Sequence, residues 1–428
     1  MTVKQLRGPS DSYLDWKNTL LQTSHSRLHH LCLTAILSLL PLIAQSQPRV
    51  PTDAAEVLER LPMRPTDASA RTLAQLRTAV LLAAKESPAD PAAATRLAEH
   101  YFDLAMASGD PRYVGYADAV IKPFSEAKSA ALLVMRGQLK QYRHHFQEAL
   151  NDFDAALKLD PQLASANAWR GAIFLVQAKY PDAQKECAAL RALGSDNLYG
   201  GCQGLALAYN GQMDAGFSLL KHTLEATQVA GNRLWLLTRM AEVATWRGQV
   251  KDAENYYVQA LALKLDDGYL LAAWADFLLD QNRPAEVVKW LAKWDTSDGL
   301  LLRLALAETQ LKLKAATAHV QTLDDRFAAA KLRGDTTHLA EEARFQLQLR
   351  GNASAASRLA SANYAIQREP RDARVLLESA LAAGDGAAAE TVRDWLKSSR
   401  FEDAHLRQLG QATAALPQLA TDSSGPPR

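Results

Sequence analysis

Apolar residues recur every three or four positions through most of the chain, from about residue 70 to residue 398. This spacing puts them on one side of an α-helix, so each such stretch predicts an amphipathic helix. No long stretch alternates β-branched and polar residues, which is the pattern of a half-buried strand. Residues that favour helix ends separate the stretches, as in Gly194-Ser195-Asp196, Gly231-Asn232, Asp266-Asp267-Gly268 and Gly384-Asp385-Gly386. The pattern therefore predicts an all-α chain with essentially no β-sheet.

One stretch combines small, aromatic and proline residues at a spacing that suits two packed helices. Gly137 is followed twelve residues later by Ala149, and then by Phe153, Ala156 and Pro161. Small side chains at Gly137 and Ala149 let two antiparallel helices cross closely, while Phe153 and Ala156 share one face of the second helix. Pro161 cannot continue that helix. The segment therefore predicts a helical hairpin.

These residue types at these positions resemble the tetratricopeptide (TPR) repeat, a helix pair of about 34 residues. The period recurs along the chain, with well-matched units that begin at Ala130, Ala164, Asn197, Leu234 and Gly268. A further unit spans Pro91–Phe124, and three helix pairs with weaker motifs follow residue 298. Lys140 departs from the repeat, which has a large aromatic residue at that position. The resemblance implies a TPR-type α-α superhelical solenoid of antiparallel helix pairs.

The N-terminal segment has the composition of a secretory signal peptide. A fourteen-residue apolar run at residues 31–44 follows Arg27 and ends at Ala44-Gln45-Ser46, whose small residues suit signal peptidase. The run is shorter than the ~20 residues that a membrane-spanning helix needs. We therefore predict cleavage after Ser46 and export to the periplasm of a bacterium. A protein anchored in the inner membrane and facing the periplasm is the alternative.

The chain is thereby divided into five predicted segments. They are a signal peptide at 1–46 with a polar leader at 1–26, an extended leader at 47–69, an N-terminal and central TPR array at 70–297, degenerate helix pairs at 298–403 and a tail at 404–428.

Charge and motifs argue against several functions. Cleavage after Ser46 would remove four of the 48 basic and two of the 47 acidic residues, which leaves a net charge of −1. A protein with that charge balance lacks the excess of basic residues that is typical of nucleic-acid binding. No phosphate-binding glycine loop, HExxH, GxSxG or CxxC motif occurs, and the His144-His145 doublet lies in a predicted turn without a zinc-type ligand set. We expect no catalysis, no cofactor, no metal, no nucleic-acid partner, and no membrane contact after signal removal.

The resemblance also implies where a partner would bind, because the first helix of each TPR pair lines a concave groove. Carried over to this sequence, the groove residues are Tyr142, Tyr209, Trp235, Arg239, Glu242, Trp246, Tyr269 and Asp276. Aromatic residues beside a few charges suit a peptide-binding surface. The Lys, Asn and Arg set that clamps a peptide carboxylate in chaperone-binding TPR domains is not reproduced.

We therefore predict a periplasmic scaffold or adaptor that binds a partner protein or peptide in this groove. Two alternatives remain open. One is an enzyme with an unrecognised site in the degenerate repeats at 298–403, and the other is an envelope assembly factor that self-associates. The sequence does not indicate the oligomeric state.

Cys187 and Cys202 are the two cysteines that remain after signal removal. An even pair in an oxidising compartment favours a disulfide. Cys187 lies seven residues before Gly194 and Cys202 seven residues after Ser195, so the two occupy the same height on neighbouring antiparallel helices. We predict a Cys187–Cys202 bridge. The alternative is two small thiols packed in a tight helix interface.

Overall fold

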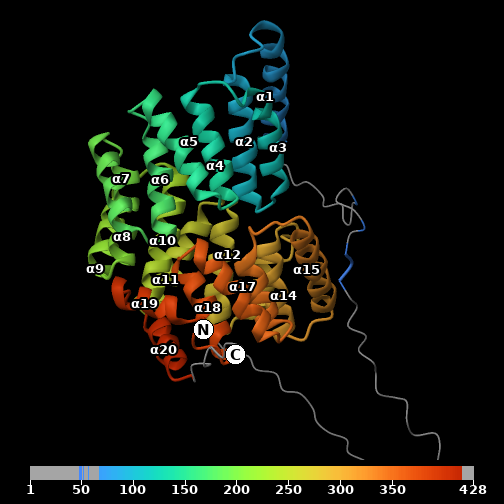
Figure 1. The fold of residues 1–428 in the computed structure, drawn as a ribbon, viewed down its shortest axis with the longest axis vertical. Coiled ribbons are helices and arrows are strands. Elements are labelled where there is room, and N and C mark those ends of the chain that lie inside the picture. Colours follow the sequence, from blue (N-terminus) through green and yellow to red (C-terminus); the bar gives the residue numbers. More distant parts are fainter. Residues whose placement is uncertain (1–47, 51, 53–55, 57–66, 417–428) are drawn as a thin grey trace, which may run out of the picture. The chain divides into compact units, whose positions relative to one another are not determined.

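The computed structural model describes residues 48–50, 52, 56 and 67–416 (Figure 1). Among these residues every regular element is helical, which confirms the all-α expectation. The elements in chain order are α1 (Asp67–Glu86), α2 (Ala92–Ser108), α3 (Arg112–Ile121), the 3₁₀ turn η1 (Lys122–Phe124), α4 (Ala130–Tyr142), α5 (Phe146–Leu159), α6 (Ala164–Val176), α7 (Tyr180–Ala192), α8 (Asp196–Tyr209), α9 (Met213–Ala226), α10 (Ala230–Trp246), α11 (Val250–Ala262), α12 (Gly268–Asp280), α13 (Pro284–Leu291), α14 (Asp298–Gln310), α15 (Ala315–Leu332), α16 (Leu339–Gln348), α17 (Ala353–Ile366), α18 (Pro370–Ala383), α19 (Glu390–Ser399) and α20 (Ala404–Ala414).

The helices form the antiparallel pairs of a TPR-type solenoid, and small residues stand where the helices of a pair cross. A Cβ atom on Gly137 of α4 would lie 2.5 Å from the ring of Phe153 on α5, so the ring occupies the space that the glycine leaves. In the α8–α9 pair the backbones themselves meet. A Cβ atom on Gly216 would lie 2.4 Å from the carbonyl oxygen of Gly204. The small residues of the sequence motif therefore set the spacing between the helices.

The turn between the first and second helix of each pair contains a residue in the left-handed backbone region. These residues are Gly109, His144, Ala178, Gly211, Gly248, Asn282, Lys312, Gly351 and Gly384. The left-handed residue lets the chain reverse within a few positions. Because several of them are not glycine, the sequence pattern did not reveal this regularity.

Three helix boundaries differ from the sequence predictions. The helix α1 begins at Asp67, inside the predicted extended leader at 47–69. Gly231 does not separate helices but lies in the first turn of α10, which begins at Ala230. The expected tail from residue 404 is wrong for its first part, because residues 404–414 form α20. The side chain of Asp403 caps this helix by accepting a hydrogen bond from the Leu406 N–H at 2.8 Å, and the Leu406 side chain is buried.

The C-terminal helices fold back against the turns of earlier helix pairs. The backbone N–H of Arg368, between α17 and α18, donates to the carbonyl of Val176 at the end of α6 at 2.7 Å. Beside it, the side-chain amide nitrogen of Gln367 donates to Nε2 of His144 in the α4–α5 turn. These contacts join segments far apart in the sequence, and they bring α18 close to the central repeats.

A disulfide joins α7 to α8, as the sequence predicted. The Cys187 and Cys202 sulfurs are 2.02 Å apart and their Cα atoms are 5.5 Å apart. Both side chains are buried. The bridge therefore fastens the second helix of one pair to the first helix of the next.

The predicted signal peptide at 1–46 and the end of the predicted tail lie outside the described residues. Within the part of the chain that the structure describes, no helix has the length and apolar character to cross a membrane.

Candidate functional site

Four of the predicted groove residues come together on two neighbouring first helices. On α10, Nη1 of Arg239 donates to Glu242 at 2.8 Å and to the hydroxyl of Tyr269 on α12 at 2.7 Å. The Tyr269 hydroxyl in turn donates to the second oxygen of Glu242 at 2.6 Å. The fourth residue is Trp235, whose ring centroid lies 6.0 Å from Cζ of Arg239. The three hydrogen bonds form a closed triangle that fixes all three polar side chains.

The geometry of the helices explains why these side chains meet. Arg239 and Glu242 are three residues apart and therefore lie on the same face of α10. Tyr269 stands in the first turn of α12, whose start is set by the side chain of Asp267, which accepts from the Leu270 N–H at 2.7 Å. Parallel packing of successive first helices then places Tyr269 opposite the arginine.

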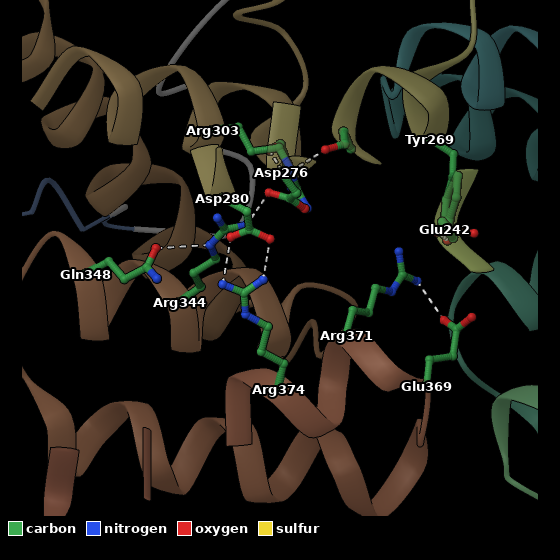
Figure 2. Close-up of polar contacts among 12 residues, drawn as sticks. Glu242, Tyr269, Asp276, Asp280, Arg303, Arg344, Gln348, Glu369, Arg371 and Arg374 are labelled. Atoms are coloured by element: carbon green, nitrogen blue, oxygen red, sulfur yellow. Dashed lines mark hydrogen bonds and ion pairs between the residues drawn. The ribbon is translucent and has the colours of Figure 1, made fainter. Parts of the chain in front are cut away.

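A fifth residue, Arg371 on α18, completes the group. Its Cζ lies 5.2 Å from the centroid of the Tyr269 ring, on which Arg239 also packs at 4.3 Å. Figure 2 shows Arg371 and Glu369 across from Tyr269 and Glu242. We call Trp235, Arg239, Glu242, Tyr269 and Arg371 the arginine–aromatic cluster.

The two ends of the arginine–aromatic cluster are open to solvent while its centre is not. Trp235 is 36% exposed and the Arg371 side chain is 53% exposed, whereas the Arg239 and Glu242 side chains are 15% and 14% exposed. The inner edge of Trp235 rests on α8, because a Cβ atom on Gly201 would lie 2.1 Å from the Trp235 ring. A rigid polar centre therefore holds an exposed indole and an exposed guanidinium.

Burial and charge fix the protonation of the central residues. Burial holds the pKa of Tyr269 above its usual value, so the phenol stays protonated and donates to Glu242. Burial alone would lower the pKa of Arg239, but Tyr269 and Glu242 hold that pKa well above its usual value. Across the physiological range the centre therefore keeps one arrangement of donors and acceptors.

Asp276 is the remaining charged residue among the predicted groove residues, and it belongs to a second group of ion pairs further along α12. It accepts from Arg303 of α14 at 2.6 Å and from Arg344 of α16 at 2.5 Å (Figure 2). Burial would raise the pKa of Asp276, but the two guanidinium groups hold it well below its usual range. One turn later, Asp280 accepts two hydrogen bonds from Arg374 of α18, at 2.6 and 2.8 Å.

These charges define a surface that we call the inner face. It is the side of the first helices α10, α12, α14, α16 and α18 that carries the residues labelled in Figure 2. Most of its arginines and carboxylates are paired between different helices, and those of α12 are paired with arginines of α14, α16 and α18. Most of this polar lining is therefore structural.

Two predicted groove aromatics are covered by the chain itself. Tyr209 is only 3% exposed, and its ring packs on Trp246 with centroids 5.6 Å apart. Phe401, from the segment after α19, lies 6.3 Å from Tyr209 and 5.3 Å from Trp246. Next to them, the Trp395 indole of α19 donates to the hydroxyl of Tyr180 at 2.7 Å. The expectation that Tyr209 faces an open groove is wrong, because the C-terminal segment buries it, whereas Trp246 is partly buried against Phe401.

Tyr142 is also removed from the arginine–aromatic cluster. Its partly buried ring packs edge-on against Phe102 of α2, with centroids 6.4 Å apart. Burial raises the pKa of its hydroxyl above the usual value, helped by the carboxylates of Asp298 and Asp335. Tyr142 therefore belongs to the packing of the N-terminal repeats.

The sequence did not predict the arginines that the C-terminal half contributes to the inner face. They are Arg303, Arg344, Arg371 and Arg374. The TPR register is weakest after residue 298, so no groove position could be assigned there. Helical periodicity would have placed these arginines on first helices, but it could not have shown that α18 lies opposite α12.

His144 forms a hydrogen bond with Gln367, which lies far away in the sequence. No group of three or more His, Cys, Asp and Glu residues suited to a metal ion occurs in the described part of the chain. The neutral Nε2 of His144 accepts from Gln367, and burial lowers the pKa of the imidazole to about 4. This histidine therefore joins an early repeat to the C-terminal helices in its uncharged form.

No protein-family model and no curated protein matches the chain. Among solved structures, a chain of the APC/C hetero-tetramer Cut9-Hcn1 is similar with a TM-score of 0.48 and 13% identity over 80% of this chain and 67% of that one. The human IFIT1 dimer with m7Gppp-AAAA gives 0.40 and 13% over 81% and 86%. The Rap protein complexed with competence and sporulation factor gives 0.37 and 12% over 84% and 91%. These values are too low to carry an inference about function.

Proposed function

We propose that this protein is an exported scaffold that binds a segment of a partner protein on its inner face, without catalysing a reaction. The observation that supports the proposal is the arginine–aromatic cluster. Tryptophan, tyrosine and arginine are the side chains that contribute most to protein–protein binding. Here Trp235 and Arg371 are exposed at the two ends of a group whose centre is held by three hydrogen bonds.

Preorganisation explains why such a site would bind well. The side chains are already fixed by neighbouring helices, so little conformational entropy is lost when a partner arrives. Trp235 is seated over Gly201 and the Tyr269 ring contacts two guanidinium groups. A partner would therefore pack an apolar side chain on the indole and place polar groups at the arginine end.

The proposed location follows from the sequence of the first 46 residues. The apolar run at 31–44 and the cleavage motif that ends at Ser46 favour export to the periplasm. The Cys187–Cys202 disulfide agrees with this location, because disulfides persist in oxidising compartments.

Affinity capture with two matched tryptophan variants tests the function. Tagged protein is crosslinked in its native envelope, and the captured partners of wild type, Trp235→Ala and Trp246→Ala are compared at equal amounts of folded protein. Because Trp235 is partly exposed, its replacement should remove capture with little change in stability. Trp246 packs under Phe401, so its replacement should cost about 3 kcal/mol of stability and leave capture by the folded fraction intact. Equal capture by wild type and Trp235→Ala would contradict the proposal.

A further inference from the structure

Arg371 differs from the other arginines of the inner face in how much of its guanidinium group the protein uses. Arg239 donates to Glu242 and Tyr269. Arg344 donates to Asp276 and Gln348, and Arg303 donates to Asp276 and to two backbone carbonyls. Arg374 holds both Asp280 and Glu378. Each of these four arginines therefore has at least two different acceptors.

Among the residues that the structure describes, Arg371 donates to one acceptor only. Its Nη2 lies 2.8 Å from an oxygen of Glu369, two residues earlier in the chain. A guanidinium has five N–H donors in a planar fork, so most of those of Arg371 face solvent. The side chain is 53% exposed, against 35% for Arg374, 17% for Arg344 and 9% for Arg303.

The position of Arg371 is nevertheless fixed. Glu369 holds it from one side, and the Tyr269 ring lies 5.2 Å from its Cζ. Its backbone is held at the start of α18, where Glu369 and Asp372 form a capping box. A surface arginine on a flexible stem would lose side-chain entropy on binding, and Arg371 loses little because these contacts already order it.

No other carboxyl group near Arg371 serves as a second acceptor for its guanidinium group in the described part of the chain. Asp372 is buried and already accepts from the Glu369 N–H at 3.1 Å and from Asn363 at 3.0 Å. Glu341 of α16 interacts with Arg371 only through longer-range electrostatic attraction, and it is also attracted by the charges of Arg303 and His338. The planar fork of Arg371 therefore stays available for a bidentate acceptor.

From this geometry we infer that the partner segment carries an aspartate or glutamate side chain that binds Arg371 beside the Tyr269 ring. The inference rests on the proposed function, since it names the chemistry of the segment that the inner face receives. A carboxylate matches the guanidinium fork with two parallel hydrogen bonds. An apolar residue of the same segment packs on Trp235 at the other end of the arginine–aromatic cluster. The ligand is therefore a mixed acidic and apolar segment.

A displayed library of random twelve-residue peptides, selected on the full chain, tests this inference. Peptides from wild type should be enriched in Asp or Glu at a fixed distance from an apolar residue. Replacing that acidic residue by Asn or Gln in a synthetic peptide should weaken binding at least tenfold. Arg371→Met should lose the same affinity for the acidic peptide and show no preference between the acidic and amide forms. Arg283→Met, which removes an arginine that pairs with Glu254 and Glu286 away from the inner face, is the matched control and should bind like wild type.

Charge reversal gives a result that a merely structural arginine would not produce. Selection on Arg371→Glu should enrich Lys or Arg at the position that was acidic for wild type. If peptides depend on Trp235 but show no acidic preference, or prefer basic residues on wild type, the inference about Arg371 is wrong and the proposed function stands. If no selected peptide depends on Trp235 or Tyr269, the proposed function fails together with the inference.

Discussion

Replacement of Gly216 by alanine tests the close crossing of α8 and α9. The new Cβ atom would lie 2.4 Å from the Gly204 carbonyl oxygen and 2.8 Å from the Ala208 backbone nitrogen. Both atoms are backbone, so no side-chain rotation relieves the contact and the two helices must separate. Overpacking of this kind costs ~1–3 kcal/mol, and the higher helix propensity of alanine recovers up to ~1 kcal/mol. We expect a net loss of about 1–2 kcal/mol in the stability of this pair.

Gly115→Ala is the matched control. Gly115 lies inside α3, and its new Cβ atom would meet no atom within 4 Å. Only the higher helix propensity of alanine changes the stability there, so the stability of α3 should increase by up to ~1 kcal/mol.

Native-state hydrogen exchange, measured by mass spectrometry on peptides from each helix, reports the two pairs separately. Amides of α8 and α9 should exchange roughly 5–30 times faster in Gly216→Ala, since each 1.4 kcal/mol is about a factor of ten. Amides of α3 should exchange more slowly in Gly115→Ala. Unchanged or slower exchange of α8 and α9 in Gly216→Ala would show that these helices do not cross at the glycines.

Three further predictions follow from the disulfide, from His144 and from the N-terminus. Alkylation of the unfolded, unreduced protein should label neither Cys187 nor Cys202, and labelling of both would disprove the bridge. Reduction of the bridge should lower the free energy of unfolding by ~3 kcal/mol, because the bridge closes a loop of 15 residues. Burial lowers the pKa of His144 from 6.5 to about 4, so the unfolded chain takes up this proton first and acidification from pH 6.5 to 4 should cost up to ~3 kcal/mol. Denaturant titrations across that range should show a smaller loss for His144→Gln, and an equal loss would refute the assignment. N-terminal sequencing of the protein from a periplasmic extract should begin at Gln47, whereas an intact apolar run in the membrane fraction would favour the anchor.

The helix pairs could be predicted from the sequence because the residues that determine each pair lie close together in the chain. Small residues such as Gly137 must stand where helices cross, and the apolar positions must share a face. The Cys187–Cys202 bridge was predictable for the same reason, since a single tight turn relates its two helices. Local sequence also contains a signal for α20, because Asp403 can cap a helix that contains the apolar Leu406, although the segment as a whole predicts a polar tail.

The candidate site was predictable only in part, because it depends on contacts between distant segments. Arg239, Glu242 and Tyr269 lie on adjacent first helices, so repeat positions alone brought them together. Arg371 joins them only because α18 returns to face α12. The C-terminal segment likewise packs Phe401 against Trp246. An aromatic residue at a groove position cannot reveal from its own sequence whether a later segment will bury it.

Site-specific photocrosslinking tests the central claim most directly. A benzophenone side chain is introduced either at Trp235 on the inner face or at Val258 on α11, two apolar positions that are 36% and 51% exposed. Each protein is irradiated in its native envelope, and crosslinked products are identified by mass spectrometry. If the inner face binds the partner, the Trp235 position should give one dominant adduct and the Val258 position should not. Adducts of the same partner from Val258 alone would contradict the account.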